Sequence, residues 1–221
     1  MLISLSSESQ DISYLKDLHD KGLPILFFDR VSDEIETHTV TANNYEGAFH
    51  ATEHLIYQGF KRIAHITSSP FLSITKERLE GYKNALIKHN MTVDEGLIRY
   101  CLHGGMIAAE MEDAFSSLFK VKSKPDAILT AGDRLTIVGF SILKRMKQKK
   151  EVGFAGFTNT QVGDLFSPAL TVVRQPAAEI GQIAIELLIQ MIESKRPVTD
   201  FQNKVLNTEL IIRESSKGAK L

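Results

Sequence analysis

Polar side chains follow most of the predicted strands, at the point where each apolar run ends. They carry hydroxyl, amide, carboxylate and guanidinium groups and come from both halves of the chain: Ser4, Ser6, Asp29, Arg30, Asn43, Asn44, Thr75, Arg78, Asp133, Thr158, Asn159 and Gln175. Because right-handed crossovers bring the carboxyl ends of parallel strands to one side of a sheet, we expect these groups to line one crevice. Short hydroxyl and amide groups around an arginine suit a polar, hydroxyl-rich small molecule.

The patterns of a catalytic or metal centre are not evident in the sequence. We find no nucleophile elbow, phosphate loop or paired carboxylates, and Gly104-Gly105 is too short to cradle a phosphate. His50 and His54 have the i, i+4 spacing of zinc ligands, but Glu53 is misplaced for the H-E-x-x-H motif and no third ligand is evident. We therefore expect surface or packing roles for these histidines, and we predict no enzyme, no cofactor and no metal site.

The composition is that of an ordinary globular protein, with 221 residues of which 43% are hydrophobic and 24% are charged. The 26 basic and 27 acidic side chains give a net charge of −1, which disfavours nucleic-acid binding by this chain alone. The single cysteine, Cys101, excludes an internal disulfide and fits a reducing cytosol, so we expect a cytoplasmic protein. No signal peptide and no apolar run of ~18 residues is evident, so we expect no membrane partner.

Apolar strand runs alternate with helix-like stretches, which predicts an α/β fold with parallel sheets. The expected strands cover residues 24–28, 38–41, 62–67, 126–130, 151–157, 170–173 and 205–212. The expected helices cover residues 11–21, 44–57, 73–90, 106–119, 134–149 and 176–194. One apolar stripe marks the last helix: Ile180, Ile183, Ala184, Leu187, Leu188 and Met191. A further strand pattern begins at Leu2, directly after Met1, so we expect a fragment of a longer protein.

Eight short motifs follow one another over roughly residues 23 to 215. They are L-P-I-L-F-F-D-R from Leu23, V-T-A-N-N-Y-E-G-A from Val40, A-T-E-H-L from Ala51, G-F-K-R-I-A from Gly59, R-L-E-G-Y from Arg78, A-G-D from Ala131, T-V-V-R-Q-P from Thr171 and T-E-L-I-I-R-E-S from Thr208. In this order they resemble the effector-binding core of LacI/GalR-family bacterial transcription regulators, which is similar to a type I periplasmic sugar-binding protein.

The resemblance implies two α/β lobes of the periplasmic-binding-protein-like type I architecture. Residues 1–41 and 174–203 would form a partial N-terminal lobe, residues 43–172 and 204–215 the C-terminal lobe, and residues 216–221 a tail. It also implies a ligand-sensing and dimerisation core, in which a sugar-like or nucleoside-like effector binds between the lobes and controls operator affinity. Operator DNA would be bound only through a helix-turn-helix head absent from this chain, and the core would be a homodimer. The alternative is a solute-binding protein of a sugar transport system.

Within the resemblance, Arg78 takes the place of the family's pocket arginine, Asp29 that of its inter-lobe aspartate, and Gln175 lies at the third crossover between lobes. The predicted ligand-binding residues are Ser4, Asp29, Asn43, Thr75, Arg78, Asp133, Thr158 and Gln175. Asn43, Gly132 and Thr158 depart from the Asp, Asn and Asp of the family pattern. These departures argue against a pyranose read by a charged aspartate and leave open a different ligand or a loss of ligand control.

Overall fold

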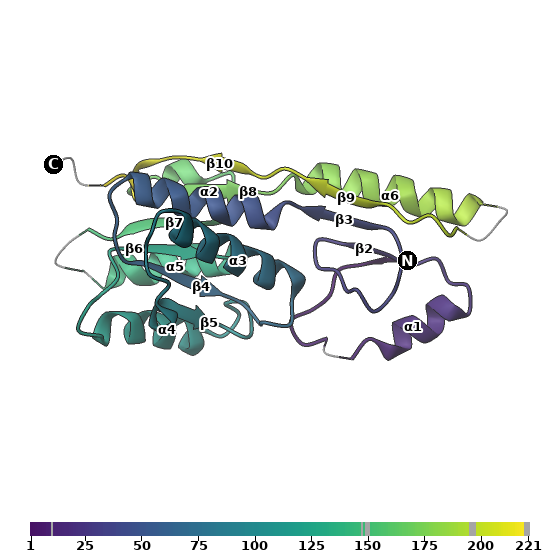
Figure 1. Ribbon diagram of the computed structural model, residues 1–221, viewed down its shortest axis with the longest axis horizontal. Coiled ribbons are helices and arrows are strands. Elements are labelled where there is room, and N and C mark those ends of the chain that lie inside the picture. Colours follow the sequence, from purple (N-terminus) through teal and green to yellow (C-terminus); the bar gives the residue numbers. More distant parts are fainter. Residues whose placement is uncertain (10, 147, 149–150, 195–197, 219–221) are drawn as a thin grey trace.

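The computed structural model describes residues 1–9, 11–146, 148, 151–194 and 198–218 and contains two separate sheets. Figure 1 shows an elongated molecule, with a six-stranded sheet (the large sheet) at one end and a four-stranded sheet (the small sheet) at the other. Among the described residues every strand pair but one is parallel. The predicted α/β fold with two parallel sheets is therefore confirmed.

The small sheet has one helix against each of its faces. Its strand order is β1 (Leu2–Ile3), β2 (Leu26–Phe28), β3 (Thr39–Ala42) and β9 (Asn203–Leu206). Leu26 and Val40 pack against α6 (Ala177–Glu193), whereas Ile25 and Phe27 pack against Leu15 of α1 (Ser13–Asp20). Successive residues of β2 thus serve two different cores, as the two-residue period of a strand requires.

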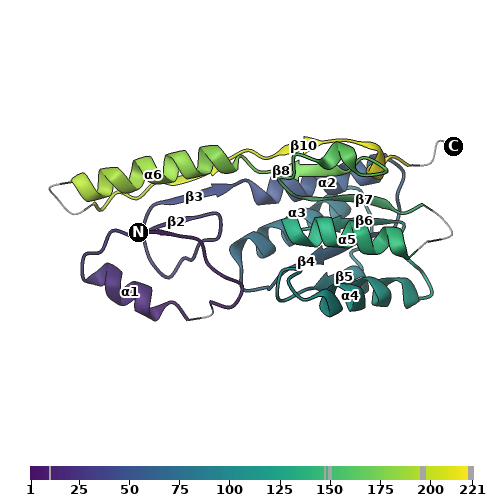
Figure 2. The ribbon, with the colours of Figure 1, turned by 180° about the vertical axis from the view of Figure 1, so that it is seen from behind.

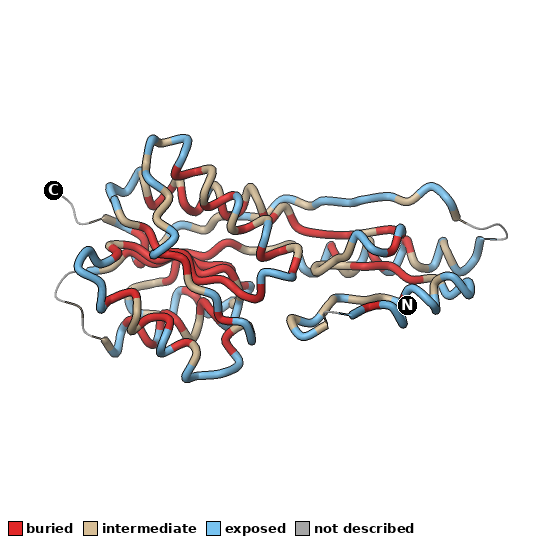
Figure 3. Tube along the Cα trace, turned by 60° about the horizontal axis from the view of Figure 1, so that its bottom comes forward, coloured by how far each residue is buried: buried red, intermediate tan, exposed pale blue. Residues whose placement is uncertain are grey.

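The large sheet is covered by two pairs of helices. Its strand order is β10 (Glu209–Ile211), β8 (Thr171–Arg174), β7 (Gly153–Phe157), β6 (Ala127–Thr130), β4 (Ile63–Thr67) and β5 (Ile98–Tyr100). One face packs against α2 (Asn44–Tyr57) and α3 (Ser73–Lys88), and the other against α4 (Ala108–Lys120) and α5 (Asp133–Arg145), which Figure 2 shows from behind. The strands between these layers form the most continuous buried region of the molecule (Figure 3).

The chain passes between the sheets three times, and the third crossing differs from the prediction. Residues 205–212, expected as one strand, form β9 in the small sheet and β10 in the large sheet. Residues 204–206 therefore pair with β3 rather than within the C-terminal lobe, and Arg174 belongs to β8 of the large sheet. The apolar pattern of this segment does not show where the chain leaves one sheet and enters the other. The short strand β5 has only one buried residue, Ile98, and was not predicted.

Ser216, expected to begin the tail, is buried in the large unit. Its Oγ lies 2.7 Å from His54 Nε2 and 2.6 Å from Thr171 Oγ1, while Ser215 Oγ donates to Phe154 O at 2.7 Å. His54 thus packs between α2 and the C-terminal segment, as expected for a packing rather than a metal role. Residues 219–221 of the expected tail and residues 195–197 of the expected first lobe lie outside the described residues.

Helix α6 has two apolar faces. The predicted stripe packs on the small sheet, where Ile180, Ala184 and Leu187 are buried. The exposed apolar residues of α6 are instead on another face, at positions 185, 189 and 192. Across the described part of the chain, no helix has both the length and the apolar character required to cross a membrane.

Two helical glycines allow a matched test of the α2–α3 packing. A Cβ on Gly81 would lie 2.2 Å from Tyr45 O, so Gly81→Ala forces the two helices apart. A Cβ on Gly181 of α6 would meet nothing within 4 Å. In urea denaturation we expect Gly81→Ala to lower the free energy of unfolding by about 1–3 kcal/mol or more, and Gly181→Ala to raise it by up to ~1 kcal/mol. Equal effects of the two substitutions would contradict the packing described here.

Candidate functional site

Arg78 lies inside the large unit, near the junction with the small sheet. Only 2% of the residue is exposed. Its Nε and Nη2 donate to Asn44 Oδ1 at 2.9 and 2.6 Å, and its Nη1 donates to the Ala131 carbonyl at 3.0 Å. The guanidinium also stacks over the Phe157 ring, 4.0 Å from the centroid. Residues from α2, α3, β7 and the end of β6 therefore fix one side chain.

Asn44 connects this arginine to a carboxylate. Its Nδ2 donates to Glu77 Oε2 at 2.8 Å and to Ala42 O at 3.0 Å, while its Oδ1 accepts from Arg78. Within the described residues, no carboxylate hydrogen-bonds Arg78 directly. Burial lowers the pKa of Arg78 to about 10, against the opposing effects of Asp29 and Glu77. Burial likewise raises the pKa of Glu77. Three of the five guanidinium N–H groups serve the fold, which leaves two that can donate to a ligand.

Asp29 faces this cation from the small sheet. It follows β2 with a φ of 57°, a left-handed conformation uncommon for residues other than glycine. Gln175 Nε2 donates to its Oδ1 at 3.2 Å, and Arg30 Nε lies 3.6 Å from its Oδ2. The Asp29 carboxylate also raises the pKa of Arg78, against the effect of burial, and no hydrogen bond joins the two groups within the described residues. A carboxylate and a guanidinium thus approach each other from different sheets.

The strand ends next to Arg78 hold a second polar group. The Thr158 hydroxyl donates to Asp133 Oδ1, and Asp133 is exposed at the start of α5. Asn159 and Gln175 exchange hydrogen bonds, with Gln175 N donating to Asn159 Oδ1 at 2.8 Å and Asn159 Nδ2 to Gln175 O at 3.1 Å. Gln175 therefore links the end of β7 to Asp29 of the small sheet.

Not all of the predicted residues join this group. Asn43 caps α2, where its Oδ1 accepts from Glu46 N at 3.1 Å. Ser4 is exposed after β1 and has no hydrogen bond to the other predicted residues within the described structure. Thr75 is buried in the first turn of α3, and its hydroxyl has no partner among the described residues. The structure thus brings Asp29, Arg78 and Gln175 together, with Asp133 and Thr158 beside them.

Asn44 was among the strand-end residues expected to line the crevice but not among the predicted ligand-binding residues, and Glu77 was in neither set; Asn44 bonds Arg78, and Glu77 bonds Asn44. Asn44 followed a predicted strand end, but nothing in the sequence around it indicated that its partner would be Arg78. Glu77 directly precedes Arg78 on α3, so helical geometry alone would point the two side chains in different directions. Phe157 was assigned only to a strand. No local signal in the sequence identifies a hydrogen bond between residues 34 positions apart.

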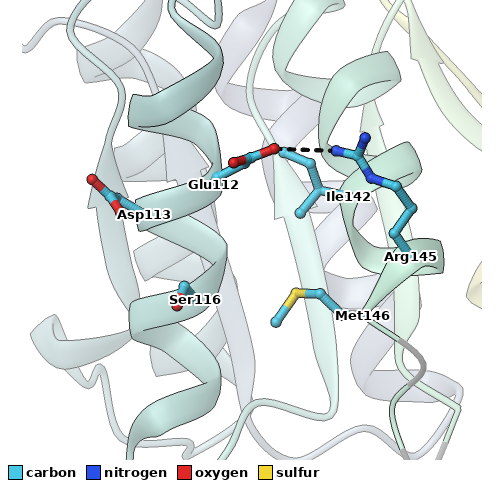
Figure 4. Close-up of a pocket in the computed structure, with 6 residues that line it drawn as sticks. All are labelled: Glu112, Asp113, Ser116, Ile142, Arg145 and Met146. Carbon is cyan, nitrogen blue, oxygen red and sulfur yellow. Dashed lines mark hydrogen bonds and ion pairs between the residues drawn. The ribbon is translucent and has the colours of Figure 1, made fainter.

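A cavity of about 420 Å³ lies elsewhere, between α4 and α5 (Figure 4). Its lining residues are Glu112, Asp113, Ser116, Ile142, Arg145 and Met146. Glu112 and Arg145 are paired across it at 3.5 Å. Ile142 is nine residues beyond Asp133, which is roughly 13 Å along the helix. The cavity contains none of the predicted ligand-binding residues.

Comparison with known proteins gives consistent matches. A family model described as a periplasmic binding protein-like domain matches residues 52–216. The ribose operon repressor of Haemophilus influenzae is 27% identical over 204 residues, covering 90% of this chain and 59% of the relative. The HTH-type transcriptional repressor PurR of Vibrio atlanticus is 25% identical over 224 residues, covering 98% of this chain and 64% of that protein. The chain thus spans about 60% of the length of these relatives.

A solved structure shows the same architecture. The sugar-binding transcriptional regulator (LacI family) of Escherichia coli, in complex with phosphate, superposes with a TM-score of 0.77 and 25% identity, covering 97% of this chain and 76% of that one. The three proteins named here are two repressors and a LacI-family transcriptional regulator.

Two adjacent asparagines provide a test of how Arg78 is held. Asn44→Ala removes the acceptor of two guanidinium N–H groups and leaves a buried cation without that partner, so we expect a loss of about 3–5 kcal/mol in the free energy of unfolding. Asn43→Ala removes only a helix cap and should cost about 1 kcal/mol. Urea denaturation of both variants measures the difference. If the two variants lose equal stability, Asn44 does not support Arg78 as described.

Proposed function

Because this chain belongs to the periplasmic-binding-protein-like domain family, as the ligand-binding core of a LacI-family regulator, we propose that it binds a small polar metabolite between its two sheets and so controls the regulator's affinity for DNA. The observation that supports the proposal best is Arg78. It is buried, held by neutral acceptors, and faces Asp29 of the other sheet with two N–H groups to spare. A fork of this kind clamps ligand oxygens.

The groups at the junction favour a ligand that both donates and accepts hydrogen bonds. Arg78 can only donate, and the Asp29 carboxylate can only accept. A ligand hydroxyl placed between them satisfies both. Asn43, Gly132 and Thr158 supply no charged oxygen, and the Asp133 carboxylate already accepts from Thr158. A hydroxyl-rich metabolite, sugar-like or nucleoside-like, fits this arrangement.

Closure of the two sheets around the ligand would carry the signal. The chain crosses between them near residues 42–43, 174–176 and 206–209, which are the points available for hinging. Away from these crossings, Val31 N of the small unit donates to Ser73 Oγ at the start of α3 at 3.2 Å. A ligand that holds Asp29 and Arg78 together favours the closed angle. With balanced charge, this core is not itself expected to hold DNA, so operator binding is a property of the whole cytoplasmic regulator.

A homodimer is the assembly we propose. Several large apolar side chains are exposed in the loops that follow β5 and β7: Leu102, Met106, Ile107 and Leu165. The loop after β5 begins at the carboxyl end of the large sheet, on the side of the proposed effector site, whereas Leu165 lies near the amino end of β8, where Leu170 N donates to Gly163 O at 2.9 Å. Contact between two copies through the loop after β5 would couple ligand binding in one copy to the orientation of the other.

The effector site predicts a ligand-dependent rise in melting temperature. We expect a sugar or nucleoside from a screen of D-ribose, adenosine and D-glucose 6-phosphate to raise it, since binding to the native state alone stabilises it. Arg78→Ala should weaken that ligand by roughly 1.5–3 kcal/mol, measured by titration calorimetry. Lys76→Ala, exposed on the same helix, is the control. Arg78→Lys keeps the positive charge but loses the fork of guanidinium N–H donors. If a folded Arg78→Lys or Arg78→Ala variant binds the ligand as tightly as the wild type, Arg78 is not part of the effector site.

The dimer predicts a specific mass. Light scattering at tens of micromolar should give twice the chain mass for the wild type. Replacing Met106, which is 67% exposed in the loop after β5, with Asp should yield a monomer of unchanged helicity. Ile212→Asp, at another exposed apolar position, should leave the dimer intact. A monodisperse wild-type monomer would contradict the proposal.

A further inference from the structure

Unpartnered polar atoms gather on the inner side of Arg78. Six buried side-chain nitrogen or oxygen atoms lack a hydrogen-bond partner within the described residues. Four of the six belong to three residues of β4 and α3: both ring nitrogens of His65 and the hydroxyls of Thr67 and Thr75. Native proteins have few such atoms, because each one loses its hydrogen bonds to water without replacement.

The geometry of β4 and α3 explains why these groups lie together. Ile63, His65 and Thr67 alternate with residues of the opposite core, so they face α3. The His65 ring stacks on Tyr82 of α3, with centroids 4.8 Å apart and 16° between the planes. Arg78 lies one turn before Tyr82 and Thr75 nearly one turn before Arg78. His65, Thr67 and Thr75 therefore lie next to Arg78, on the side that faces the interior of the large unit.

Other buried threonines of the same unit have partners. Thr52 Oγ1 donates to Ala48 O at 2.8 Å, and Thr136 Oγ1 has two acceptors within hydrogen-bond distance for its one proton, Phe157 O at 2.8 Å and Gly132 O at 2.7 Å. The interior of this unit is thus built to satisfy hydroxyl groups, and Thr67 and Thr75 are exceptions. Burial lowers the pKa of His65 to about 3, so the ring is neutral at pH 7 and offers one donor and one acceptor.

We propose that His65, Thr67 and Thr75, together with the two remaining N–H groups of Arg78, form an inner wall of the effector site that binds the hydroxyl-bearing end of a neutral metabolite. The inference rests on the proposed effector site and assigns these three residues to ligand specificity. Hydroxyls match a wall that contains donors and acceptors side by side. An anionic group would only accept and would leave the acceptor nitrogen of His65 unmatched.

The first test uses the protein without ligand. His65→Phe keeps the ring stacked on Tyr82 and removes both nitrogens, while Thr67→Val and Thr75→Val remove only a hydroxyl. If these groups are reserved for a ligand, each substitution should raise the melting temperature by about 2–4 °C. Thr136→Val, the matched control with bonded partners, should lower it. An unchanged or lowered melting temperature in His65→Phe and Thr67→Val means that these groups serve the fold, and the inner wall is then wrong.

The second test separates the inner wall from the effector site itself. D-ribose, adenosine and D-glucose 6-phosphate are titrated into the wild type and the variants, and affinity is measured by calorimetry. A probe that binds the wild type should bind His65→Phe and Thr67→Val at least tenfold more weakly. If the variants bind it as tightly as the wild type, the inner wall is overturned and the effector site stands. If the wild type binds none of the probes, the proposed effector class fails, and the melting temperatures alone decide whether the wall belongs to the fold.

Discussion

The burial of one cation organises the junction of the two sheets. A guanidinium with 2% of its residue exposed requires acceptors for its N–H groups, because an unsatisfied buried charge costs several kcal/mol. Asn44 and Ala131 supply these acceptors, and the Phe157 ring stacks against the guanidinium. Asn44 comes directly after the first crossing between the sheets, and Ala131 directly after β6. The contacts that satisfy Arg78 therefore also fix the first crossing against the large sheet.

The same arrangement keeps the cation available. Glu77 balances its charge through the Asn44 amide instead of a direct ion pair. A bidentate carboxylate would occupy the guanidinium fork. With neutral acceptors on one side, the fork retains donors on the other, and Asp29 supplies a nearby charge from the small sheet. In the proposed effector site, a ligand between these two groups would meet charges of opposite sign.

Close packing behind the site makes this precision possible. Gly81 lets α3 lie against the backbone of α2, and Gly47 lets α2 lie against Val173 and Phe157. Any larger residue would move the helices that carry Asn44 and Arg78. The two cores on either side of the large sheet hold the strand ends in register, so Asp133 and Thr158 meet where their strands end. Small residues on α2 and α3 thus help to position the candidate site.

Local pattern in the sequence was sufficient for the elements and for part of the site. Strand and helix periods depend on residues two to four positions apart. All six helices were therefore predicted within a few residues of their bounds. The one exception is the end of the helix expected to run to residue 149, because that prediction includes residues outside the described structure. Arg78, Asp29 and Gln175 were identified because they follow strand ends or match a family motif. Tertiary structure alone decided the split of residues 205–212 between sheets and the partners of Arg78. It also decided that the ring nitrogens of His65, in the middle of an apolar strand, would have no hydrogen-bond partner in the described part of the chain. The reason is physical: these outcomes depend on which groups meet across 34 to 165 residues of chain, and local periodicity contains no information about such distances.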